Sequence, residues 1–190
     1  MIGVINSLLF DYVEAHYGAT KLHELKQHLL MPADYTFRID TYYADNEWQD
    51  TYRKTITFIG GERDKVEWDF GYFCGDALKQ QFPTFIKGCT CSRDLIVRQP
   101  KIHNAIGNSV NDPSTRQIIN QKFTLEERDD KIVMHYVSVN QLCTFYRSLA
   151  TWVSEQFGET VTIDEPRCMK RGDAECEIHL RFAKAGVPNS

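Results

Sequence analysis

Apolar residues recur with a helical period through most of the first half of the chain. Between residues 4 and 17 they stand at offsets 0, 3, 4, 7 and 8, the spacing of one helix face: Ile5, Leu8, Leu9, Tyr12 and Val13. Similar patterns, with glycine or proline near the segment ends, predict further helices over 20–30, 45–58, 66–81 and 92–107. Pro100 lies inside the last of these, so we expect that helix to kink or restart there.

The pattern changes in the second half of the chain, after an expected loop over 108–117. Alternation of period two predicts strands over 118–124, 131–138, 160–168 and 176–182. A strongly amphipathic helix over 141–157 interrupts these strands. Helices followed by a mostly antiparallel sheet with one long helix are typical of an α+β fold.

Composition and charge restrict the class of protein. With 190 residues, 42 % of them apolar and 25 % charged, the chain fits one globular domain, which we place at residues 1–182. Residues 183–190 are expected to be a disordered tail. The net charge of −4 argues against a nucleic-acid partner.

Sequence motifs narrow the class further. No stretch reaches the roughly 18 apolar residues of a membrane span, and the first residues do not resemble a signal peptide, so we expect a cytoplasmic protein without a membrane partner. Nucleophile-elbow, H-E-x-x-H, P-loop and paired-carboxylate signatures are absent, which argues against an enzyme.

Several short motifs occur in an order that resembles a known family. They are MIGVIN…VEAHYG at the start, Phe70–Gly71, Ile102–His103, HYVS before the long helix, and PRCMKRGDAECEIHL near the end. Over about residues 1–182 the chain resembles the heme-nitric oxide/oxygen-binding (H-NOX) domains, which are related to the heme domain of the soluble guanylate cyclase beta subunit. The resemblance implies heme b between a helical N-terminal lobe and a C-terminal lobe with a sheet. It also implies that His103 is the axial ligand of the heme iron, a role that suits a neutral imidazole.

The family holds the heme propionates with a Tyr-x-Ser-x-Arg motif on a strand. The matching residues here are Tyr136, Ser138 and Asn140, so an asparagine stands where the family has an arginine. Period two places the three side chains on one face, but asparagine carries no charge with which to bind a carboxylate. Arg116 and Arg147 are candidates to replace that charge.

The family resemblance also implies which gas is bound. Oxygen-binding members carry a tyrosine nine residues after the motif tyrosine, where this chain has Phe145. The other residues expected to line the distal pocket also lack a strong donor: Ile5, Leu9, Cys74, Leu78 and Leu149. We therefore expect a stand-alone sensor that binds nitric oxide and CO but not O2 stably, and that signals to a separate protein such as a histidine kinase or diguanylate cyclase.

The six cysteines supply an alternative function. Some family members bind zinc in the terminal lobe, and Cys143, Cys168 and Cys176 resemble three of those ligands, with Glu165 at the fourth position. His179 is another candidate for the fourth ligand. A disulfide between two of these cysteines would instead make a redox response. The alternative to a gas sensor is thus a heme-free or weak-heme relative that senses zinc or thiol redox state.

Overall fold

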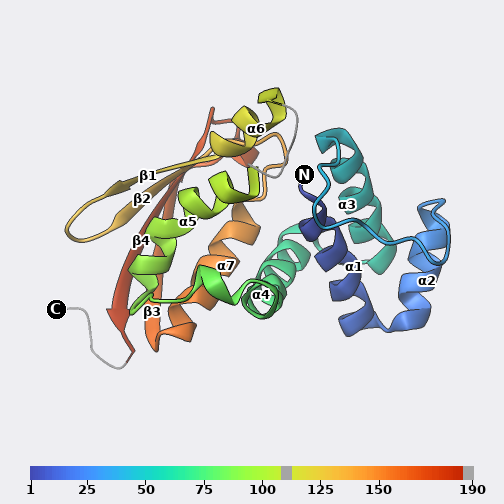
Figure 1. The fold of residues 1–190 in the computed structure, drawn as a ribbon, viewed down its shortest axis with the longest axis horizontal. Coiled ribbons are helices and arrows are strands. Elements are labelled where there is room, and N and C mark those ends of the chain that lie inside the picture. Colours follow the sequence, from blue (N-terminus) through green and yellow to red (C-terminus); the bar gives the residue numbers. More distant parts are fainter. Residues whose placement is uncertain (108–112, 186–190) are drawn as a thin grey trace.

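The computed structural model describes residues 1–107 and 113–185 and divides them into two lobes (Figure 1). The N-terminal lobe is helical, and its elements are α1 (Gly3–Tyr17), α2 (Ala19–His28), α3 (Asp45–Ile59) and α4 (Arg63–Gln81). Gly18, at a φ of 87°, ends α1 and allows the chain to turn directly into α2.

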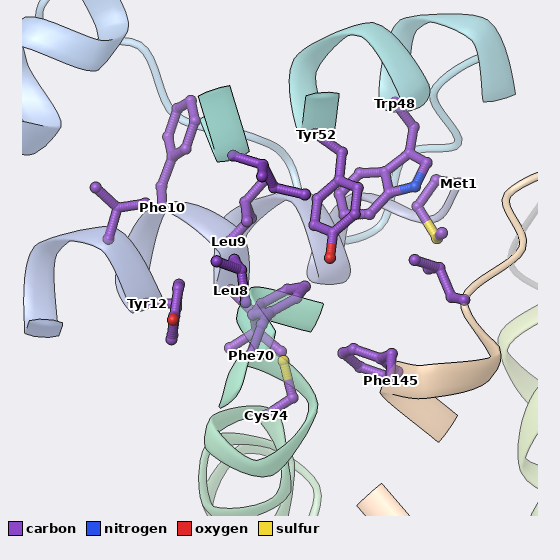
Figure 2. Packing of buried hydrophobic residues seen from close by; sticks show 14 of the residues in the cluster. Met1, Leu8, Leu9, Phe10, Tyr12, Trp48, Tyr52, Phe70, Cys74 and Phe145 are labelled. Atoms are coloured by element: carbon purple, nitrogen blue, oxygen red, sulfur yellow. The ribbon is translucent and has the colours of Figure 1, made fainter. Parts of the chain in front are cut away.

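One hydrophobic core holds the helical lobe together. Aromatic and aliphatic side chains from α1, α3 and α4 meet in its centre, as Figure 2 shows for Leu8, Leu9, Trp48, Phe70 and Cys74. Each of these side chains is at most 1 % exposed, so this core is closely packed.

The C-terminal lobe contains an antiparallel sheet in the order β1-β2-β4-β3. Its strands are β1 (Phe123–Glu127), β2 (Ile132–Tyr136), β3 (Glu159–Arg167) and β4 (Cys176–Lys184). The helices α5 (Ser92–Gly107) and α7 (Cys143–Gln156) pack on the sheet (Figure 1). A second core lies between these layers, so each lobe buries its own apolar surface.

The two lobes meet where α4 packs against α7. Gly71 and Gly75 make this close approach possible. A Cβ atom on Gly71 would lie 2.6 Å from the Phe145 carbonyl oxygen, and one on Gly75 would lie 2.2 Å from the Trp152 ring. The short 3₁₀ helix η1 (Pro83–Phe85) then connects α4 to the second lobe.

The expected α+β fold is confirmed, but three local expectations are wrong. Residues 118–120 belong to the helix α6 (Pro113–Asn120) rather than to a strand, because Pro113 is well placed in a first helical turn. α5 is one continuous helix through Pro100, so it does not restart there. Strand β4 extends to Lys184, so the expected tail begins too early; residues 108–112 and 186–190 lie outside the described residues.

Candidate functional site

A cavity of about 480 Å³ lies between the two lobes. Its walls come from α1 and α4 on one side, and from α5, the start of β1, the end of β2 and α7 on the other. Most of the lining side chains are apolar, including Ile5, Leu78, Ile96, Ile102, Phe123, Phe145 and Leu149. The volume is in the range of about 300–1,000 Å³ that is usual for ligand and cofactor sites.

His103, from the last turns of α5, faces this cavity. The imidazole keeps some accessible surface because it faces the cavity, while protein atoms enclose it elsewhere. Its ring centroid lies 4.5 Å from that of Phe123. Burial, and then the nearby positive charge of Lys122, lower the pKa of His103 to about 4. The imidazole is therefore neutral at pH 7 and has a lone pair available for a metal.

The motif strand contributes two of its three expected side chains to the cavity. Tyr136 and Ser138 both line it. Leu142 N donates to Tyr136 Oη over 3.1 Å, and Asn140 N donates to Ser138 Oγ over 3.3 Å. These bonds fix both hydroxyl oxygens at the cavity edge.

The expectation that Asn140 faces the same site is not met. Asn140 does not appear among the described residues that line the cavity, and its Nδ2 donates to Asp45 Oδ1 over 2.9 Å. The chain turns after Ser138, so the period-two alternation that should place Asn140 beside Tyr136 ends before it; β2 itself ends at Tyr136.

Of the polar residues that line the cavity and that the sequence analysis did not predict, Lys122 and Tyr146 are buried. Lys122 is only 8 % exposed, and burial lowers the pKa of its ammonium group. Tyr146 is 3 % exposed, and its hydroxyl has no hydrogen-bond partner among the described residues. The Tyr146 ring packs on Phe123, 5.6 Å between centroids, and therefore lies on the His103 side of the cavity.

The cavity walls contain four of the six residues expected in the distal pocket. Ile5, Leu78, Phe145 and Leu149 line the cavity. The remaining two residues, Leu9 and Cys74, are fully buried in the helical core and do not reach it. Figure 2 shows Phe145 projecting from α7 toward Phe70 on α4, with 5.2 Å between the ring centroids.

A second polar cluster lies in the C-terminal lobe. One ligand atom from each of Cys143, Glu165, Cys168 and Cys176 falls within 4.8 Å of the other three. Cys143 Sγ lies 3.5 Å and Cys176 Sγ 4.0 Å from Cys168 Sγ, and all three thiols are free. Tetrahedral zinc with Zn–S bonds of about 2.3 Å separates two sulfurs by about 3.8 Å. We call these four residues the cysteine cluster.

The cysteine cluster is buried and short of partners. Burial, and then the Glu165 carboxylate, raise the pKa of the Cys143 thiol well above its usual range. Burial raises the pKa of Cys176 to about 11, although the Met169 N–H that donates to its sulfur acts to lower it. Glu165 Oε1 is buried without a partner among the described residues. His179 lies elsewhere, 2.7 Å from Glu177, so it is not the fourth member.

Comparison with known proteins places the chain in a family. The sequence model of the family described as Haem-NO-binding matches residues 2–165. The chain belongs to this H-NOX family. H-NOX domains are heme-binding gas-sensor domains. No curated protein matches the sequence significantly.

Solved H-NOX structures share the fold at low sequence identity. An H-NOX protein from S. oneidensis in the Fe(II)NO ligation state is 19 % identical, with a TM-score of 0.80 over 97 % of this chain and 100 % of that one. An oxygen-binding H-NOX domain related to soluble guanylate cyclases, in its oxygen complex, is 15 % identical, with a TM-score of 0.77 over 100 % and 99 %. Unliganded Fe(II) H-NOX mutant A71G from K. algicida gives 0.74 at 16 % identity over 98 % of each chain.

The expected family resemblance is thus confirmed for this H-NOX chain. Among residues 1–107 and 113–185, no helix is long and apolar enough to cross a membrane. The cavity also fits heme, the group that the family binds. Its lining combines a neutral imidazole, apolar walls and a buried cation.

Proposed function

We propose that this protein is a gas sensor that binds nitric oxide at ferrous heme b, with His103 as the axial ligand. The observation that supports this most is the neutral, desolvated imidazole of His103 facing an apolar cavity between the lobes. Family membership favours this function over a heme-free relative. Bound heme would supply the iron at which a diatomic gas binds.

The chain's own residues would hold and protect this group. His103 would direct its lone pair into the cavity from α5, while the apolar residues of both walls exclude water. Tyr136 and Ser138 would donate hydroxyl hydrogen bonds to the heme carboxylates, because both hydroxyls line the cavity and are held there by the backbone N–H groups that their oxygens accept.

The expected distal pocket favours nitric oxide and CO over dioxygen. Its side chains Ile5, Leu78, Phe145 and Leu149 carry no hydrogen-bond donor. Ferrous heme binds nitric oxide tightly without a donor, whereas dioxygen needs one for stability. We therefore propose that this protein forms no stable complex with dioxygen.

Heme reconstitution tests the proposed function. The wild-type protein should take up heme and show a Soret band that moves on reduction and on addition of nitric oxide. His103→Ala should lose the spectrum of a histidine-ligated heme, and free imidazole should restore it. His23→Ala is the matched control, because His23 is exposed on α2 and should keep the wild-type spectrum. A wild-type protein without heme, or an unchanged His103→Ala spectrum, would contradict the assignment.

We further propose that the sensor signals to a separate cytoplasmic protein such as a histidine kinase or a diguanylate cyclase. The contact between α4 and α7 joins the lobes directly beside the cavity, so a change at the cavity wall reaches both lobes. Adding the heme-loaded protein to a candidate partner should change the partner's activity only when nitric oxide is present. An identical effect with the heme-free protein would contradict this role.

A structural zinc ion in the cysteine cluster is a second proposal. It is supported by the sulfur separations of 3.5 and 4.0 Å and by the unpartnered Glu165 Oε1. Protein purified with zinc should hold it stoichiometrically, and Cys168→Ser should lose it. Cys89→Ser is the control, since this thiol lies outside the cluster. A colourless wild-type protein with stoichiometric zinc would support the heme-free alternative instead, and a heme protein without zinc would contradict the zinc proposal.

A further inference from the structure

Lys122 is a buried cation at the polar edge of the cavity. It is 8 % exposed and lines the cavity together with Tyr136 and Ser138. Val137 N donates to Lys122 O over 3.0 Å, which holds the lysine backbone beside the segment that carries these two hydroxyls. A cation and two hydroxyl donors therefore meet at one edge of an otherwise apolar cavity.

The charge of Lys122 has no close partner in the protein. Among the described residues, no carboxylate oxygen lies within 4.0 Å of its ammonium group. Asp45 attracts this charge from further away, but Asp45 Oδ1 already accepts from the Met1 amino group and from Asn140 Nδ2, each over 2.9 Å. Burial of an unpaired ammonium group is costly, so the surroundings favour an anion in the cavity.

The other charged side chains that line the cavity have a partner in the protein. Asp40 lies at the rim and pairs with Arg38 over 3.3 Å. Lys79 Nζ donates to Gln156 Oε1 over 2.8 Å. Arg147, a candidate for the missing charge, lies 3.6 Å from Glu165 of the cysteine cluster instead.

We propose that Lys122 binds a carboxylate of the heme and so supplies the positive charge that Asn140 cannot. This inference rests on the proposed function, because it needs heme in the cavity. A lysine binds a carboxylate as a point charge, without the bidentate geometry of arginine. The anion-binding charge thus comes from the residue just before β1, whereas the two hydroxyls come from the last residue of β2 and from the turn that follows it.

Heme dissociation measures this contact directly. Transfer of heme to excess apomyoglobin should be about 10- to 100-fold faster from Lys122→Met than from the wild type, the range for one lost charged hydrogen bond. Lys122→Arg should restore most of the retention. Lys79→Met is the matched control, since it removes a cavity-lining lysine whose ammonium already has a partner, and it should behave as wild type.

The melting temperature of the heme-free protein should change in the opposite direction to heme retention. Lys122→Met should raise its melting temperature, because the variant removes an unpaired buried charge and keeps the side-chain volume. A purely structural lysine would give a lower melting temperature. A lower melting temperature together with unchanged heme retention would therefore overturn the inference.

Heme with esterified carboxylates separates this contact from general packing. The wild type should lose the dimethyl ester faster than heme, and the difference between the two rates should be smaller in Lys122→Met, where the Tyr136 and Ser138 hydroxyls still bind the carboxylates. Wild-type protein that binds heme, with Lys122→Met equally retentive, overturns this inference alone. A wild type that takes up no heme overturns the proposed function and this inference together.

Discussion

The cavity edge and the cysteine cluster are both buried and polar, but the group without a partner is a cation in the first and a carboxylate oxygen in the second. At the cavity edge, Lys122 is a cation without a nearby anion. In the cysteine cluster, the Glu165 carboxylate pairs with Arg147 over 3.6 Å, but its Oε1 atom, beside the three thiols, has no hydrogen-bond partner among the described residues. A buried polar group without a partner is costly, which is why we propose an anion at the cavity edge and a metal ion in the cysteine cluster.

α7 separates these two regions and touches both. Cys143 begins the helix and belongs to the cysteine cluster, while Phe145, two residues later, lines the cavity. The first residues of one helix therefore contribute to two chemically different sites, because successive residues point about 100° apart around a helix. Three substitutions or conditions test how independent the two regions are.

The largest expected effect is at Glu67, which connects the two regions. Glu67 is fully buried, accepts from Phe145 N over 3.1 Å and lies 2.9 Å from Lys170 Nζ, two residues after Cys168. Glu67→Ala should lower the free energy of unfolding by about 3–5 kcal/mol, because it leaves a largely buried Lys170 and a helix N–H without this acceptor. Urea unfolding of the heme-free protein measures this.

Two further variants sharpen the test at Glu67. Glu67→Gln keeps an acceptor for Phe145 N and should lose less stability than Glu67→Ala. Glu62→Ala, at an exposed position before α4, should have little effect. If Glu67→Ala altered only zinc content or only heme binding, the two regions would be independent and this link would be wrong.

Acid should destabilise the protein through His103 at the cavity and should leave the thiols of the cysteine cluster unchanged. In the heme-free protein, the pKa of His103 is about 4, below its ordinary value of 6.5, so between these values the unfolded chain binds a proton that the folded chain excludes. The stabilisation is complete above pH 6.5 and is lost as the pH falls toward 4, by about 3 kcal/mol in total. The thiols of Cys143 and Cys176, with raised pKa values, stay protonated throughout.

A histidine variant isolates this acid effect. His103→Gln should flatten the dependence of unfolding free energy on pH between 4 and 6.5, measured by urea unfolding at several pH values. His23→Gln should keep the wild-type slope, since His23 is exposed. Equal slopes in all three proteins would show that His103 is not desolvated.

The smallest expected effect is at Phe145, where a hydroxyl would make the apolar wall of the cavity polar. Phe145→Tyr should increase the dioxygen affinity of the heme-loaded protein about fivefold, equivalent to one neutral hydrogen bond of about 1 kcal/mol. Gas titration followed by absorbance measures this, with Phe145→Leu as a control without a donor. Zinc content should stay unchanged, although Cys143 is only two residues away; an unaltered dioxygen affinity would place Phe145 away from the bound gas.

The long periodic elements were predictable from the sequence, and the short ones were not. The helix expected over 141–157 is α7 (Cys143–Gln156), because its apolar stripe fits only one period. The strand expected over 118–124 was wrong, since two adjacent isoleucines resemble a strand whether or not a helix includes them. Short apolar runs have no period to distinguish the two structures.

The candidate site was predictable where a motif fixes local spacing. Tyr136 and Ser138 line the cavity, and Cys143, Glu165, Cys168 and Cys176 meet as a cluster. Lys122 could not be predicted, because a lysine between two elements is usually exposed and only the tertiary fold buries it. Asn140 was misplaced because the chain turns after the motif strand.

The glycine contact between α4 and α7 has a mechanical consequence. Gly71 approaches α7 so closely that a Cβ atom there would lie 2.6 Å from the Phe145 carbonyl oxygen and 3.1 Å from the Ser148 Cβ atom. A contact of this kind has no rotamers with which to absorb a displacement, so a shift of one helix moves the other by a similar amount. We expect the two lobes to rotate as rigid bodies about the contact between α4 and α7.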